Sequence, residues 1–206
     1  MSQILTVQAF PSSLTTESQE RKGWGRLAMW LFLASDLMTF GGLLISYAIL
    51  RAHNTNWPFP SEHLALTLGV VMTVLLLGSS ITMRQAHIAV QNDNLRQFTT
   101  FMAATILAGV TFLFLQGYEW SHLLHEGMTV SQNPWGAPLF GATFYTLTGF
   151  HGLHVFAGVL YLLTILCTGQ KKAQLVTYDE EVTMAGIYWH FVDVVWVFVF
   201  TSVYLW

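Results

Sequence analysis

Five long apolar stretches alternate with short polar segments along this chain. A helix needs about 20 mostly apolar residues to cross a bilayer core of about 30 Å. The stretches are apolar on all sides, as helices surrounded by lipid or by other helices are, and they lack the alternation of barrel strands. The pattern predicts an all-α integral membrane bundle of five transmembrane helices at residues 27–50, 63–83, 98–120, 141–166 and 184–206.

The first residues of the chain, 1–23, form a polar stretch rich in Ser, Thr and Gln. This stretch lacks the apolar core of a secretory signal peptide. The loops between the apolar stretches leave no segment long enough for a soluble domain. We therefore expect a polar N-terminal tail followed by one transmembrane domain at 24–206.

Composition agrees with a membrane protein and excludes several other classes. Hydrophobic residues make up 53% of the chain and charged residues 9%, against about 25% charged residues in ordinary globular proteins. Eight Lys and Arg against eleven Asp and Glu leave no basic surface for nucleic acid. The single cysteine, Cys167, excludes a disulfide framework.

The basic residues gather at one end of the predicted helices. Only Arg51 falls at the other end. Because cytoplasmic loops carry an excess of Lys and Arg, this distribution predicts a cytoplasmic N-terminus and an external C-terminus. The basic residues at the predicted cytoplasmic end are Arg21, Lys22, Arg26, Arg84, Arg96, Lys171 and Lys172.

Glycines are frequent in the fourth apolar stretch, at positions 141, 149, 152 and 158. Small residues allow helices in a membrane to approach closely. We therefore expect the helix at 141–166 to lie at the centre of the bundle.

Ionisable residues also lie inside the apolar stretches, where a charged side chain costs about 2.5–3.5 kcal/mol on insertion scales. At a rise of 1.5 Å per residue, two of the acids lie roughly 14 Å from the cytoplasmic end of their helices. Asp36, His154, His190 and Asp193 fall in the cytoplasmic half of the membrane. Glu119 lies near the outer end of its helix. The residues are Asp36, Glu119, His151, His154, His190 and Asp193.

Spacing places some of these groups on common helix faces. His151 and His154 are three residues apart, as are His190 and Asp193, so each pair shares a face. Such groups can hydrogen-bond each other within one helix or across facing helices. Two interpretations stay open: structural polar contacts between helices, or a role in lipid headgroup contact or a proton-linked network. Asp36 has no basic residue near it in the sequence.

Three metal chemistries can be compared with the sequence. A di-iron carboxylate bundle needs Glu-x-x-His on two helices, and only Glu119 and His122 supply that spacing. The depths of His154 and His190 permit a haem held by two histidines across two helices. A copper or zinc site could use His122 and His125, but no cysteine or third ligand lies nearby in the sequence.

Two long motifs lie in the last two apolar stretches: TFYTLTGFHGLHV at 143–155 and YWHFVDVVW at 188–196. The first resembles the central signature, and the second the final-helix signature, of subunit III of haem–copper terminal oxidases. Further matching positions occur in the same order along residues 24–206. They are Gly109, Phe112, Leu113, Gln116, Glu119, Trp120, Ser35, Asp36, Phe40, Ser79, Ser80, Thr82 and His87.

The resemblance implies a subunit that carries no haem and no copper and has no catalytic residue. Its implied partners are the haem- and copper-bearing subunit I, a subunit II and bound phospholipid. The implied role is to stabilise the catalytic subunit and to support proton uptake in a complex that reduces oxygen to water and pumps protons. The polar motif residues would then be structural or lipid-linked and not metal ligands: His87, Glu119, His151, His154, His190 and Asp193.

The chain departs from longer relatives at identifiable places. Asp36 stands where many relatives have a buried, carbodiimide-reactive glutamate, so the resemblance implies a proton-related or carbodiimide-reactive carboxyl with a shorter reach. Longer relatives have seven helices, and this chain matches the last five. Thr183 stands where relatives often carry a glutamate, with Glu180 and Glu181 just upstream.

The sequence thus predicts a five-helix accessory subunit of a bacterial respiratory oxidase in the cytoplasmic (inner) membrane. Cytochrome c is the first expectation for the electron donor, and quinol is the alternative. Two other classes compete with this interpretation: an independent haem- or quinone-binding membrane protein, and a small transporter.

Overall fold

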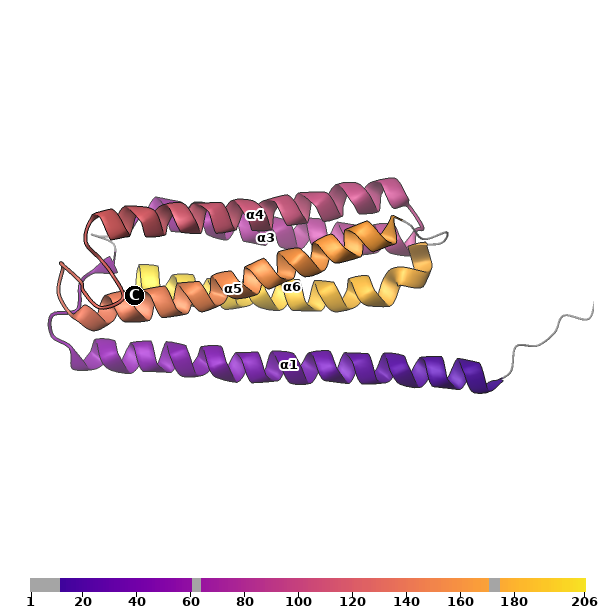
Figure 1. Cartoon of the computed structure of the whole chain (residues 1–206), viewed down its shortest axis with the longest axis horizontal. Coiled ribbons are helices and arrows are strands. Elements are labelled where there is room, and N and C mark those ends of the chain that lie inside the picture. Colours follow the sequence, from indigo (N-terminus) through magenta and orange to yellow (C-terminus); the bar gives the residue numbers. More distant parts are fainter. Residues whose placement is uncertain (1–11, 61–63, 171–174) are drawn as a thin grey trace, which may run out of the picture.

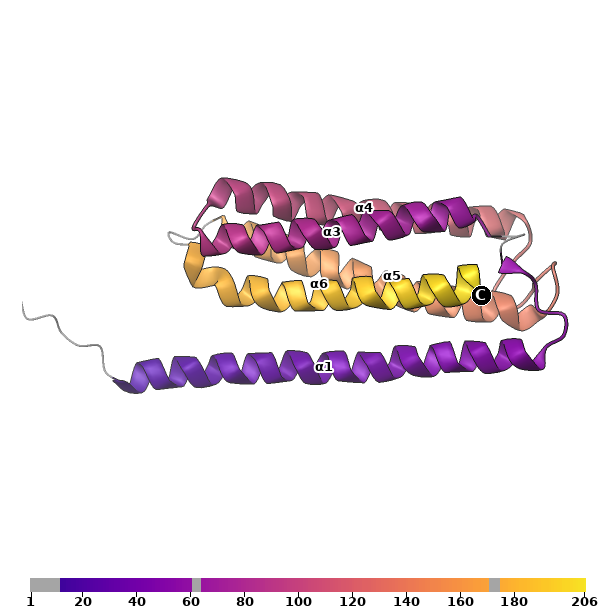
Figure 2. The same ribbon diagram turned by 180° about the vertical axis from the view of Figure 1, so that it is seen from behind.

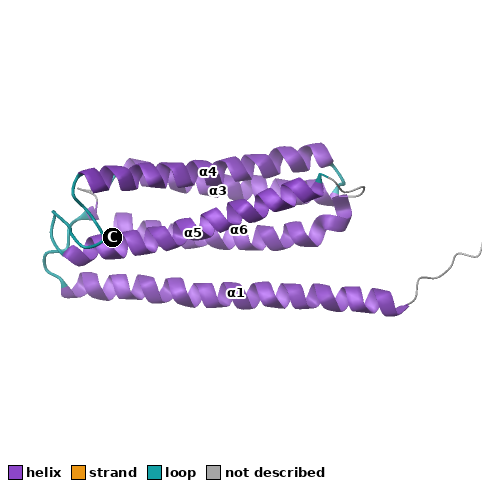
Figure 3. Cartoon of the chain, in the orientation of Figure 1, coloured by secondary structure: helices purple, strands orange, loops and turns teal. Residues whose placement is uncertain are grey.

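The computed structural model describes residues 12–60, 64–170 and 175–206. These residues form five long helices and two short helical turns, and the described part contains no strand (Figures 1 and 3). The long helices are α1 (Ser12–His53), α3 (Leu66–Gln91), α4 (Leu95–His125), α5 (Pro138–Gly169) and α6 (Asp179–Phe200). A 3-10 turn, η1 (Leu175–Tyr178), precedes α6, and a π-helical turn, η2 (Thr201–Leu205), follows it.

All five long helices contain segments long and apolar enough to cross a membrane, which confirms the predicted all-α membrane bundle. Helix α1 begins at Ser12, inside the stretch expected to be a polar tail, and its membrane-length segment is Gly23–His53. Helices α4 and α5 extend beyond the predicted ranges at both ends. Helix α3 begins later and ends later than predicted, and α6 begins earlier and ends at Phe200, where η2 continues to Leu205. Residues 1–11, His63, Lys171 and Lys172 lie outside the described residues.

The helices lie nearly parallel along one axis, and α1 lies on the opposite side of the bundle from α3 and α4 (Figures 1 and 2). Helix α1 packs against α5 and α6, α3 packs against α4 and α6, and α4 and α6 both pack against α5. Helix α6 therefore packs closely against α1, α3 and α5, and its Trp189 also lies against Gly109 of α4.

The buried fractions identify the centre of the bundle. In the most apolar 18-residue window of each helix, 56% of α6 is buried, against 39% of α5 and 17% of α1. The glycine content predicted a central position for the fourth apolar stretch, and its helix α5 packs against α1, α4 and α6 and is second in burial. Helix α6 is buried more deeply than α5, because its large side chains fill the space that glycines on neighbouring helices leave.

Two indole rings on α6 show how this packing works. Trp189 and Trp196 are among the largest fully buried side chains. A Cβ atom at Gly109 of α4 would lie 2.6 Å from the Trp189 ring, and one at Gly158 of α5 would lie 3.0 Å from it. Glycine at both positions therefore creates the space that the α6 indole occupies between two helices.

The loop ends are held by specific polar contacts. Asn94 accepts a bond from the backbone N–H of Gln97 at 3.1 Å and so caps α4. At the same end, Asp93 Oδ1 accepts a bond from Leu175 N–H at 2.7 Å, which joins the turn between α3 and α4 to η1. At the opposite end, the N–H of Ala137 donates to the carbonyl of Asn56 at 3.0 Å.

Candidate functional site

The buried acid of α1 is paired with a histidine of α5. Asp36 Oδ2 lies 3.2 Å from His154 Nε2, and the two side chains are 12% and 11% exposed. His154 Nδ1 lies 2.8 Å from the carbonyl of Phe150. A carbonyl only accepts, so Nδ1 carries a proton. The contact between Nε2 and Asp36 therefore needs one further proton, held by either the imidazole or the carboxyl group.

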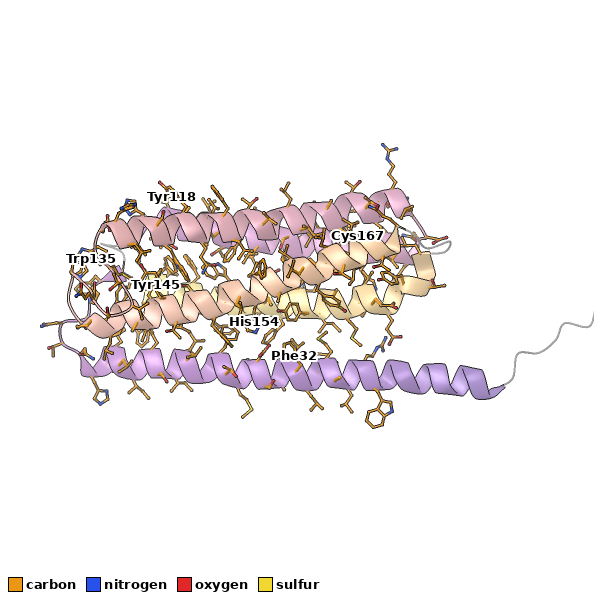
Figure 4. The ribbon with its side chains drawn as sticks, in the orientation of Figure 1. Phe32, Tyr118, Trp135, Tyr145, His154 and Cys167 are labelled. Carbon is orange, nitrogen blue, oxygen red and sulfur yellow. The ribbon has the colours of Figure 1, made fainter. Side chains whose placement is uncertain are left out.

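Aromatic rings surround this pair and limit its contact with solvent. The rings of Phe40 and Phe150 lie 5.2 and 4.7 Å from the His154 ring. The hydroxyl of Tyr188 on α6 donates to the His154 carbonyl at 2.9 Å. Figure 4 shows His154 on the side of α5 that faces α1. Asp36 has no basic neighbour in the sequence, but the tertiary structure supplies one.

A second polar group joins α3 to α6. The Ser80 hydroxyl donates to Asp193 Oδ2 at 2.5 Å and lies 2.8 Å from His190 Nδ1. Because a hydroxyl has one proton, a Ser80 that donates to Asp193 accepts from His190 Nδ1–H. His190 and Asp193, one turn apart on α6, are therefore connected through a serine of α3. Asp193 Oδ1 is buried and has no hydrogen-bond partner among the described residues.

His151 lies at the centre of the bundle and is fully buried. Neither ring nitrogen has a hydrogen-bond partner within the described part of the chain. Its neighbours are aromatic: the ring of Trp196 lies 5.0 Å away and that of Phe112 lies 5.5 Å away. His151 and His154 are near each other on α5, but the structure places them in different surroundings.

A third polar group lies at the end of the bundle where α4 ends. The hydroxyl of Tyr204 in η2 donates to Glu119 Oε2 at 2.6 Å, and Glu119 Oε1 is buried without a partner among the described residues. One turn earlier, Gln116 Nε2 donates to the carbonyl of Thr148 on α5 at 2.6 Å. Glu119 thus lies apart from the other ionisable residues, as the predicted depths indicated.

His87 belongs to a polar cluster at the opposite end of the bundle. Its Nε2 lies 3.0 Å from Asp179 Oδ1 and 3.0 Å from the hydroxyl of Thr183. On the same helix as Asp179, Glu180 forms an ion pair with Arg26 of α1 at 3.4 Å. These contacts fix the start of α6 against α3 and α1.

The positions of the histidines bear on the three metal chemistries that the sequence suggested. Both ring nitrogens of His154 are already in hydrogen bonds, while His190 is directed toward Ser80 of α3. His122 forms a contact of 3.5 Å with Glu126, the residue directly after the end of α4. Within residues 12–60, 64–170 and 175–206, no three His, Cys, Asp or Glu side chains gather in a metal-ligand arrangement.

Several residues of these polar groups were not singled out as site residues from the sequence. Among them are Ser80, Tyr188 and Tyr204, which donate hydroxyl hydrogen bonds to an acid or to a backbone carbonyl. For Tyr204, the position along the helix is a usable signal. Tyr204 and Glu119 both lie toward the same end of the bundle, so a contact between them could have been predicted. Hydroxyls carry no charge and are common in membrane helices, so the sequence pattern does not distinguish them.

Comparison with known proteins extends over nearly the whole chain. The family model described as cytochrome c oxidase subunit III matches residues 15–206. A cytochrome c oxidase subunit 3 of Bacillus subtilis is 36% identical over 201 residues, which cover 97% of this chain and 94% of that protein. A cytochrome c oxidase subunit 3 of Bacillus sp. (strain PS3) is 33% identical over 98% of this chain and 95% of that protein.

A quinol oxidase subunit 3 of Bacillus spizizenii is also similar, with 31% identity over 87% of this chain and 85% of that protein. The polar groups around Asp36, Asp193, Glu119 and His87 lie within the matched segment, together with the membrane-length part of all five helices. From this match and the membrane bundle, we conclude that the chain belongs to the cytochrome c oxidase subunit III family.

Proposed function

We propose that this chain is the subunit III of a proton-pumping oxidase that takes its electrons from cytochrome c and reduces oxygen to water. The observation that carries the proposal is the similarity to the Bacillus subtilis cytochrome c oxidase subunit 3 over 97% of this chain. As a member of the subunit III family, the chain is a multi-pass membrane protein that associates with other oxidase subunits.

We further propose that the chain contributes no redox centre and instead stabilises the haem- and copper-bearing subunit I, together with a subunit II. The arrangement of its interior polar groups supports this role. Asp36 bonds His154 between α1 and α5, Ser80 bonds Asp193 between α3 and α6, and Tyr204 bonds Glu119 between η2 and α4. Interior hydrogen bonds of this kind hold membrane helices together.

The pair of Asp36 and His154 also supports a proposed contribution to proton uptake. The geometry requires one proton to be shared by the imidazole and the carboxyl group across 3.2 Å. A site that already holds one proton between two bases can pass it on with little movement of either group. We place this pair in the cytoplasmic half of a bacterial inner membrane, following the distribution of basic residues.

Bound phospholipid is a further part of the proposal. Helix α1 exposes large apolar side chains along its outer surface, among them Trp24 (70%), Leu31 (64%) and Met38 (78%). An apolar surface of this size on a helix inside a bilayer is covered either by lipid chains or by a neighbouring subunit.

The test is to purify the oxidase complex with this chain and after its genetic removal. We expect unchanged haem and copper spectra in the remaining complex, oxidation of cytochrome c as the main activity, and a loss of activity during prolonged turnover. Purification of the chain alone with a haem absorption band that disappears on His154→Ala or His190→Ala would contradict the proposal.

The quinol alternative is favoured by a specific observation, the 31% identity to a quinol oxidase subunit 3. The same purified complex distinguishes the two donors. Oxygen reduction with reduced cytochrome c but not with quinol supports cytochrome c as the donor. Oxygen reduction with quinol but not with cytochrome c supports a quinol oxidase.

A further inference from the structure

An apolar groove runs between α1 and α6 on the outside of the bundle. Its volume is about 510 Å³, within the range of sites that hold small organic molecules. Several lining side chains are open to the surroundings of the bundle, since Trp30 and Leu37 are each 60% exposed and Val194 is 55% exposed. The apolar lining consists chiefly of Trp30, Leu33 and Leu37 from α1 and Ile187, Phe191 and Val194 from α6.

One side chain of the lining, His190, can form a hydrogen bond with a molecule in the groove. Its Nδ1 is already bonded to Ser80, which donates onward to Asp193. When Ser80 donates to Asp193, it accepts from His190 Nδ1–H, which leaves Nε2 of the neutral ring as an acceptor. Within the described residues, Nε2 has no hydrogen-bond partner and is absent from the fully buried polar atoms.

The depth and the charge of the groove restrict what it can bind. His190 lies six residues inside the predicted membrane span 184–206, which is roughly 9 Å along the helix axis. A phospholipid headgroup lies at the membrane surface and does not reach this depth. The lining also contains no Lys or Arg that could pair with a phosphate.

We propose that this groove binds a neutral amphiphile of the quinol class, with a ring hydroxyl that donates to His190 Nε2. Its isoprenoid tail would lie along the apolar side chains of α1 and α6. Trp30 and Phe191 supply aromatic surfaces for the ring, and the open side of the groove gives entry from the hydrocarbon region.

The acceptor at Nε2 gives the site a preference between redox forms. A quinol has hydroxyl donors, whereas the corresponding quinone has only carbonyl acceptors and cannot donate to Nε2. We therefore expect the quinol to bind about three- to tenfold more tightly than the quinone, the difference made by one hydrogen bond. The binding needs no electron transfer, so it is independent of which donor the oxidase uses.

The test is photolabelling of the purified oxidase complex in discs of zwitterionic lipid, with a quinol that carries a diazirine in its tail. We expect labelled peptides of this chain that contain residues 30–37 and 187–194. Unlabelled short-chain quinol should displace the label at a lower concentration than the quinone does, and phosphatidylglycerol should not displace it.

Three variants and a control test whether the groove itself holds the quinol. His190→Leu should raise the concentration of quinol needed for labelling about three- to tenfold, and His190→Gln, which keeps an acceptor oxygen, should recover part of the loss. Ala34→Phe fills the groove at an exposed position and should abolish labelling. Ala103→Phe, at an exposed position on α4, is the matched control and should have no effect.

Several results would overturn the inference. They are labelling confined to other subunits, equal displacement by quinol and quinone with no effect of His190→Leu, displacement by phosphatidylglycerol, or a crosslink from Ala34→Cys to a neighbouring protein that fills the groove. Each of these leaves membership in the subunit III family unaffected.

Discussion

At the scale of single residues, the interior acids of this protein differ in the partner that each one has. Asp36 faces an imidazole, Asp193 accepts from a serine hydroxyl, and Glu119 accepts from a tyrosine hydroxyl. An acid next to a base can share a proton with it, whereas Asp193 and Glu119 each accept a hydrogen bond from an uncharged hydroxyl. The same residue type therefore has different chemistry at each place.

Asp36 gives a prediction about reactivity. Carbodiimides attack a protonated carboxyl group, and His154 competes for that proton at 3.2 Å. Replacing His154 by Phe removes the only base paired with Asp36 in the described residues, and with it the group that competes for the proton. We expect a hydrophobic carbodiimide to label Asp36 in the native protein and several times faster in His154→Phe.

The labelling is measured by mass spectrometry of the peptide that contains Asp36. His125→Phe, at an exposed position at the end of α4, serves as the control and should leave the rate unchanged. Slower labelling in His154→Phe would show that the histidine does not compete for the proton.

Tyr204 gives a second prediction at this scale. Tyr204→Phe removes the only hydrogen bond that Glu119 receives among the described residues. Leaving a buried acceptor without a donor costs about 1–3 kcal/mol. We expect this decrease in the free energy of unfolding, measured by denaturation of the purified chain in detergent.

The neighbouring Tyr118 provides a matched control, because its side chain is 59% exposed while Tyr204 is 1% exposed. Tyr118→Phe should change stability little. If Glu119→Leu and Tyr204→Phe together cost the sum of the two single effects, the bond between them contributes nothing measurable.

At the scale of the helices, the contacts between α4, α5 and α6 depend on glycine opposite indole. Gly109 lies against Trp189 of α6 and Val159 of α5, where an added Cβ would lie 2.6 and 2.7 Å from their side-chain atoms. Such distances require the rings or the helices to move. Gly78 on α3 has no neighbouring atom within 4 Å of the corresponding position.

We expect alanine substitutions at these two glycines to change the free energy of unfolding in opposite directions. Gly109→Ala should lower the free energy of unfolding by about 1–3 kcal/mol because it overfills the space beside Trp189. Gly78→Ala should raise it by up to about 1 kcal/mol because alanine favours the helix. Thermal unfolding in detergent measures both, and an equal effect of the two changes would contradict the packing argument.

At the scale of the whole molecule, the ends of the bundle differ in charge. The turn between α3 and α4 lies at the same end as the start of α1 and of α6 (Figure 1). Arg26, Arg84 and Arg96 belong to this end, while Arg51 lies at the other and stacks at 5.0 Å on the Trp206 ring. From the positive-inside rule we predict that the first end is cytoplasmic.

This orientation can be tested with single cysteines in a Cys167→Ser background. We expect Asn92→Cys, in the turn between α3 and α4, to react with an impermeant maleimide only in inside-out vesicles. Ser131→Cys, in the segment between α4 and α5, should react in intact cells. The reverse pattern would show that the chain is inserted in the opposite direction.

The sequence by itself determined the five membrane-crossing helices, because each helix satisfies its own backbone hydrogen bonds and needs only a long apolar run to cross the bilayer. It also predicted the family, through motifs that lie within single helices. Only the tertiary structure decided that Asp36 meets His154, that Ser80 connects His190 to Asp193, and that α6 is central. These contacts depend on how each helix is rotated about its axis and which neighbours it has, and the apolar pattern around these helices is too uniform to specify either.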